Sequence, residues 1–199
     1  MNAREIILSA FARARNERGL KIAEPSGYLS KGHIKKADHD LVVMTDMDKL
    51  MHEDWVVTAA YYAMYHAAMA VLSKIGLESK EHAATAAVLE YFFGAKIGKP
   101  LIESFNDIKE RKDKLHLPKI EEKYMNNFWD VKRSRETMQY GIALTFSETE
   151  KVMAKARDFV MAIKLLVEDI DGKAIDVIRE ETRKQQSEAA RRINEKALS

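Results

Sequence analysis

The sequence contains no cysteine, and its 199 residues include only three prolines and eight glycines. The absence of cysteine excludes a disulfide framework, a thiolate nucleophile and a cysteine-based zinc site. Because proline and glycine are scarce and good helix formers are common, the composition favours helix almost everywhere. The sequence also lacks an apolar run of about 18 residues and a basic start followed by an apolar stretch. We therefore expect a cytoplasmic, mostly helical protein that does not span a membrane.

The composition is that of an ordinary globular protein, with 46% hydrophobic and 32% charged residues. Its length is sufficient for one core of about five to seven helices. The formal net charge is +2, so binding to nucleic acid is permitted by the composition and not implied by it.

The segment from Thr58 to Leu72 has no proline, no glycine and one side chain that titrates near neutral pH, His66. Its larger residues recur every three or four positions, which fits the period of a helix and not that of a strand. One such stripe comprises Trp55, Ala59, Tyr62, His66 and Met69. The spacing predicts a central, nearly all-round buried helix from about Glu53 to Gly76.

The same periodicity predicts further helices over residues 3–18, 26–51, 79–93, 101–111, 121–140 and 147–171, with Leu20 to Pro25 as a linker. Gly19 is the expected C-cap of the first of these helices, and Met51 is expected to face inward at the end of the second. The helix over residues 79–93 is expected to break at Gly94, and His82 near its start is expected to be exposed or to act as a cap. Ser147 and Glu150 have the spacing of a capping box. The most regular apolar stripe follows, at Val152, Ala156, Phe159, Ile163, Leu166 and Ile170. The charged run 109–119 is interpreted as a solvated connection, with a basic edge facing nucleic acid as the alternative. For the charged end 173–199 a helix is favoured over a clasping arm or a disordered tail.

The residues Tyr61-Tyr62-Ala63-Met64-Tyr65-His66-Ala67-Ala68, with Gly76 and Ser79-Lys80-Glu81-His82 after them, resemble a signature of the HEPN family. One branch of these helical nucleotide-binding domains carries Tyr-Tyr-Ala-Met-Phe-His-Ala-Ala. The resemblance implies an all-α, antiparallel bundle with a four- to five-helix core over residues 26–171. Residues 1–25, an amphipathic helix and linker, and residues 172–199 would be additional terminal segments.

The resemblance also implies partners. HEPN domains are often homodimers in which polar residues of both protomers face a shared cleft. In prokaryotes they commonly work with a small nucleotidyltransferase as toxin and antitoxin, or serve in defence systems. We therefore expect a homodimer, a nucleotidyltransferase-type partner, and RNA or a nucleotide as ligand.

HEPN ribonucleases that need no metal carry an arginine followed, after four to six residues, by a histidine. This sequence has Arg135 at that place, but Tyr140 stands where the histidine would be. A phenol with an ordinary pKa of about 10 is a poor general base at pH 7, although it can bind a phosphate or stack on a base. The resemblance thus implies binding and leaves catalysis open.

The candidate binding residues are Arg133, Arg135, Tyr140, His66 and Tyr62. His66 is either a buried histidine hydrogen-bonded to a neighbouring helix or a proton carrier lining the cleft. Two alternatives to simple binding remain. One is a ribonuclease that uses Arg135 with Tyr140 or His66, and the other is a structural protein in which Arg135 pairs with Glu90 or Asp130. The pattern of inward Glu-x-x-His pairs that a di-iron bundle needs is missing, and we expect neither a metal nor another cofactor.

Overall fold

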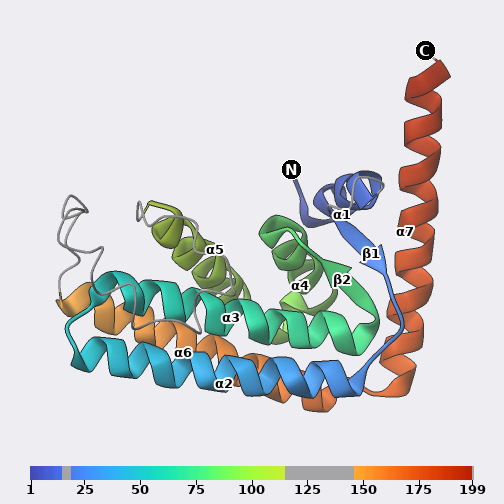
Figure 1. Cartoon of the computed structure of the whole chain (residues 1–199). Helices are drawn as coiled ribbons and strands as arrows, with labels where there is room; N and C mark the ends of the chain where they lie inside the picture. Colours follow the sequence, from blue (N-terminus) through green and yellow to red (C-terminus); the bar gives the residue numbers. More distant parts are fainter. Residues whose placement is uncertain (15–18, 115–145, 199) are drawn as a thin grey trace, which may run out of the picture.

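The computed structural model describes residues 1–14, 19–114 and 146–198. These residues form seven helices and one two-stranded sheet (Figure 1), which confirms the predicted all-α class. The helices are α1 (Ala3–Arg13), α2 (Gly27–Lys49), α3 (Glu53–Ile75), α4 (His82–Ile97), α5 (Lys99–Lys114), α6 (Phe146–Asp169) and α7 (Gly172–Leu198). The strands are β1 (Leu20–Ile22) and β2 (Leu77–Ser79).

The predicted central helix is α3, which is buried in every turn from Trp55 to Ile75. It runs antiparallel to α2, packs on α6, and has α4 and α5 on its other side (Figure 1). Gly76 ends it in the left-handed conformation, with φ of 77°. Ser26 begins α2 by accepting a hydrogen bond from the Leu29 N–H at 3.1 Å.

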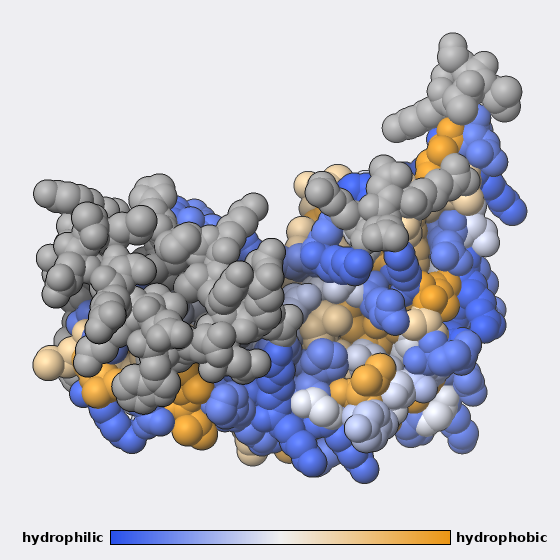
Figure 2. All heavy atoms as spheres, in the orientation of Figure 1, coloured by the Kyte–Doolittle hydropathy of each residue, from blue (hydrophilic) through white to orange (hydrophobic). Residues whose placement is uncertain are grey.

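The expectation that no apolar run reaches about 18 residues was wrong, because α3 is apolar enough by length and composition to cross a membrane. However, 78% of the qualifying window is buried inside the protein. That is how the core helix of a soluble protein behaves. On the face seen in Figure 2, most of the coloured surface is hydrophilic, and the hydrophobic residues gather in a few places.

The apolar stripe predicted for α6 is confirmed, because each of its six residues is at most 5% exposed. Phe159 in the middle of the stripe stacks on Phe105 of α5, with 5.1 Å between ring centroids. Burying an aromatic pair in this way fixes α5 against α6. α6 begins at Phe146, one residue before the predicted cap.

The predicted linker 20–25 was wrong in part, because its first three residues form β1. This strand pairs antiparallel with β2, placing Leu20 opposite Ser79 and Ile22 opposite Leu77. Just before it, Gly19 has a φ of +84°, and a Cβ there would lie 2.1 Å from the carbonyl oxygen of Ala10. The chain therefore turns tightly against α1, whose cap is Ala14 and not Gly19.

The helix favoured for the charged end is confirmed as α7, a long helix that α1 contacts over part of its length (Figure 1). Arg4 Nη2 lies 2.5 Å from Glu188 Oε2, and Arg192 Nη1 lies 2.9 Å from Glu5 Oε2. Near the start of α7, Arg179 donates a hydrogen bond to the Ala23 carbonyl at 2.8 Å. The helix is thus fixed at several points along its length.

Two further predictions about helix ends and faces were wrong. Met51 was expected to face inward, but it is 79% exposed with φ of 57°, and Met47 is buried in its place. α2 has already ended at Lys49, so the helical spacing no longer applies. Gly94 was expected to break a helix ending near residue 93, but α4 continues through it to Ile97.

Candidate functional site

Of the five candidate residues, the structure describes Tyr62 and His66, both on α3. Arg133, Arg135 and Tyr140 lie outside the described residues, as does the whole helix predicted over residues 121–140. The proposed internal pairing of Arg135 therefore stays a prediction. Tyr62 and His66 therefore mark the part of the candidate site that the structure describes.

His66 faces α2, where it meets Asp40 and His33. Its Nε2 lies 3.9 Å from Asp40 Oδ2, and the two side chains are 8% and 10% exposed. This separation is longer than a hydrogen bond, and the two groups form an ion pair only when the imidazole is protonated. The His33 ring is stacked on His66 at 5.7 Å. Both imidazoles and the carboxylate are therefore brought together between two helices.

Asp40 was missed by sequence reasoning although a signal was present. It occupies an inward position of α2, three residues after Ala37 and four before Met44, both of which are fully buried. A carboxylate in register with buried residues needs a partner, because burying a lone charge is very unfavourable. His66 on the adjacent helix is such a partner.

Tyr62 is half-buried and lies between His66 and a lysine on α5. Its ring lies 6.4 Å from that of His66, and Lys112 Nζ lies 5.0 Å from its centroid. The same ammonium is 4.5 Å from the ring centroid of Tyr61. A cation over aromatic faces is attracted to them, most strongly where water is excluded.

Lys112 is itself partly buried, and this burial lowers the pKa of its ammonium; Asp113 opposes the shift and Lys109 adds to it. Lys112 belongs to the charged run that was interpreted mainly as a solvated connection. Residues up to Lys114 instead continue α5, so Lys112 is held in place by a helix.

His82 was expected to be exposed or a cap, and that prediction was wrong. It is the first residue of α4, and its ring lies 4.2 Å from Phe105 and 5.8 Å from Tyr61. Its Nε2 lies 3.0 Å from Asn106 Oδ1, so Nε2 carries the proton and donates. Burial lowers the pKa of His82, partly opposed by the Asn106 hydrogen bond.

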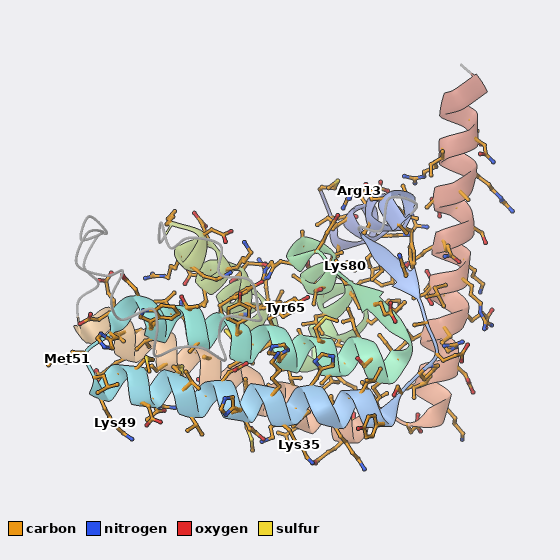
Figure 3. The ribbon with its side chains drawn as sticks, viewed as in Figure 1. Arg13, Lys35, Lys49, Met51, Tyr65 and Lys80 are labelled. Carbon is orange, nitrogen blue, oxygen red and sulfur yellow. The ribbon has the colours of Figure 1, made fainter. Side chains whose placement is uncertain are left out.

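Tyr61 and Tyr65 complete the aromatic surroundings. Burial raises the pKa of Tyr61, which packs against Tyr65 and Phe105. Tyr65 is half-buried, contacts His66 edge-on at 5.8 Å, and rises from α3 between α4 and α5 (Figure 3). Tyr61 is thus an uncharged, buried member of the cluster, next to the half-buried Tyr62 and Tyr65.

We call the side chains of His66, Tyr62 and Lys112 the α3–α5 row. It offers an imidazole, a phenol ring and an ammonium group next to one another. Aromatic faces stack on bases, and an ammonium attracts phosphate. Among residues 1–14, 19–114 and 146–198, no group of three or more histidine, aspartate or glutamate side chains is placed to hold a metal ion.

Comparison with protein families identifies residues 30–170, well over half of the chain, as matching the HEPN domain. This agrees with the resemblance seen in the sequence around Tyr62 and His66. Comparison with curated proteins gives no match.

Proposed function

The chain belongs to the HEPN domain family, and we propose that it binds a nucleotide or single-stranded RNA at the α3–α5 row. The observation that carries the proposal is the position of Lys112. Its ammonium lies over two tyrosine rings, is partly desolvated, and makes no ion pair with any residue that the structure describes. A phosphate group would supply the missing anion.

The neighbouring rings suit the rest of such a ligand. Tyr62 and Tyr65 are half-buried aromatic rings, the kind of side chain on which a base stacks. Stacking of a base on an aromatic side chain is worth about 1–3 kcal/mol and tolerates any sequence. The proposed site therefore favours unpaired nucleotides over duplex.

The proposal includes the assembly that family membership suggests. We place the protein in the cytoplasm as a homodimer, with a nucleotidyltransferase-type protein as partner in a toxin–antitoxin or defence-type system. Arg133, Arg135 and Tyr140 are proposed to contribute to the same binding surface. The support for this part is the family match and the sequence around Arg135.

Binding can be measured by fluorescence anisotropy with a 5′-labelled single-stranded RNA. Lys112→Gln should weaken binding and reduce the salt dependence by about 0.7 in the slope of log K against log salt. Lys114→Gln is the matched control, since Lys114 lies on the same helix but is exposed and paired with Glu110 at 2.7 Å. Tyr62→Leu, which removes the ring and keeps an apolar side chain, should cost roughly 5- to 150-fold in affinity.

Equal losses for Lys112→Gln and Lys114→Gln would show that RNA is attracted by general surface charge and would contradict the proposed site. Unchanged binding in all three variants would contradict it as well. A protein that binds neither RNA nor nucleotides would instead be the structural or assembly protein considered above.

A second candidate is a metal-independent ribonuclease, which the Asp40–His66 pair favours. A histidine with a carboxylate close by is a common carrier of protons in catalysis, and here the two groups are 3.9 Å apart. Labelled RNA incubated without metal should then be cleaved, and His66→Gln and Arg135→Ala should each abolish cleavage while circular dichroism shows a folded protein. RNA that stays intact with the unaltered protein restricts the function to binding.

A further inference from the structure

A surface pocket of about 360 Å³ lies where the first turns of α2 meet the last turns of α3 and α6. This volume is at the low end of the range of small-molecule sites, about 300–1,000 Å³. The pocket is separate from the α3–α5 row, because none of the three residues of the row lines it. In Figure 3, Lys35, which lines the pocket, points outward from α2, and Tyr65 lies on the opposite side of α3.

The lining is strongly basic, with four lysines and one glutamate among nine residues. Two of the lysines are already engaged: Lys164 pairs with Asp38 at 2.8 Å, and Lys74 donates a hydrogen bond to the Val167 carbonyl at 2.5 Å. The other two, Lys31 and Lys35, are exposed and form no ion pair with a residue in the described part of the chain. Two ammonium groups are therefore available to an anion.

Ser30 gives an independent indication of a ligand. This lining residue is 1% exposed, yet its hydroxyl Oγ has no hydrogen-bond partner within the described structure. A helical serine often donates to the carbonyl four residues earlier, but here the Ser26 carbonyl is bonded to the Ser30 N–H at 3.0 Å and not to the hydroxyl. Buried hydroxyl groups are normally satisfied, so a bound acceptor at this place would explain the free hydroxyl.

The direction of α2 adds to the positive potential. Gly27 and Ser30, in the first turns of the helix, both line the pocket. The amino-terminal end of a helix dipole favours bound anions. Ile34 and Val167 supply apolar surface beside the polar groups.

We infer that this pocket binds a small phosphate monoester with an apolar body. The phosphate accepts hydrogen bonds from the Ser30 hydroxyl and from Lys31 and Lys35, and the apolar body lies against Ile34 and Val167. The carboxylate of Glu168 opposes further negative charge, so a single phosphate is favoured over a polyphosphate chain or an RNA backbone.

Phenyl phosphate is a suitable probe, titrated into the isotopically labelled full chain and followed by NMR chemical shifts. Phenol, which lacks the charge, and inorganic phosphate, which lacks the apolar body, should bind at least about tenfold more weakly. Ser30→Ala should weaken phenyl phosphate about tenfold through loss of a charge-assisted hydrogen bond. The double variant Lys31→Gln/Lys35→Gln should weaken it more, and Glu168→Gln should strengthen it.

A charge-matched control is the double variant Lys49→Gln/Lys151→Gln, whose lysines are exposed elsewhere on α2 and α6 and should leave binding unchanged. Ser30→Ala should not lower Tm, because the hydroxyl makes no bond in the unliganded protein. Equal affinity in all variants would overturn the inference. The inference would also be overturned if phenyl phosphate did not bind and single-stranded RNA bound through Lys31 and Lys35.

A negative result at this pocket would not bear on the proposed binding at the α3–α5 row, since none of these substitutions changes a residue of that row.

Discussion

Gly76→Ala tests whether the junction between α3, the segment after β1 and α7 is as tightly built as the structure shows. Gly76 has a φ of +77°, and a Cβ there would lie 2.7 Å from the Ala23 carbonyl oxygen and 2.5 Å from Arg179 Nη1. The arginine is flexible and can move. The carbonyl is backbone, and the Ala23 N–H is bonded to the Gly76 carbonyl at 2.9 Å, so it cannot move without breaking the junction.

The magnitude follows from two effects. The left-handed conformation costs an L-residue about 1–2 kcal/mol, and forcing a methyl group into a packed site costs typically 1–3 kcal/mol. We expect Gly76→Ala to lower the free energy of unfolding by about 3 kcal/mol, which for a chain of this size lowers Tm by roughly 6–12 °C. Urea unfolding followed by circular dichroism measures the first quantity, and calorimetry measures the second.

Gly94→Ala is the matched control, because it is also a glycine-to-alanine change but lies inside α4 with nothing within 4 Å of the added Cβ. It should stabilise the protein by about 0.5–1 kcal/mol, since alanine is the better helix former. A loss below about 1 kcal/mol for Gly76→Ala would refute the reasoning. So would a loss for Gly94→Ala as large as that for Gly76→Ala.

Three further outcomes follow from the structure. Phe159→Ala should cost about 3–5 kcal/mol in urea unfolding because it leaves a cavity against Phe105, whereas Leu165→Ala on the exposed side of α6 should change stability by less than about 0.5 kcal/mol. Burial lowers the pKa of His82 below its ordinary 6.5, so the unfolded chain takes up the proton first as the pH falls below that value. Tm should therefore fall on acidification, and it should fall less in His82→Gln. Arg4→Gln should loosen α7 in hydrogen exchange at low salt and have a smaller effect at about 0.5 M NaCl, because the Arg4–Glu188 pair is open to screening.

The elements that could be predicted from sequence are those whose signal is local. α3 and α6 carry long, regular apolar stripes. Ser26 begins α2 through the hydrogen bond of its hydroxyl, and Gly76 ends α3 because it has no side chain. None of these features depends on a distant partner. The helical period and the residues at the helix ends are therefore enough to place them.

What escaped prediction depends on residues far away in the chain. The three residues of β1 have no strand signal of their own and gain their structure from β2, more than 50 positions later. Gly94 was interpreted as a helix breaker because glycine is a poor helix former, yet packing of α4 outweighs that small penalty.

The site, too, could be predicted only where its signal is local in the sequence. Tyr62 and His66 were found because the family signature contains them, whereas Asp40 and Lys112 reach the site from other helices. Their position depends on how α2 and α5 dock on α3, which periodicity does not specify. Only the inward register of Asp40 on α2 gave a signal that could have been used.

The pairing of α1 with α7 has a consequence for synthesis on the ribosome. Arg4 and Glu188 are 184 positions apart, so α1 leaves the ribosome long before α7 does. Until then the flank of α1 that α7 covers has no partner, and such transiently bare surface is where nascent chains associate wrongly or recruit chaperones. A stalled ribosome or a shortened transcript yields a product without α7. We expect that product to be prone to aggregation, even though the helices around α3 are already complete.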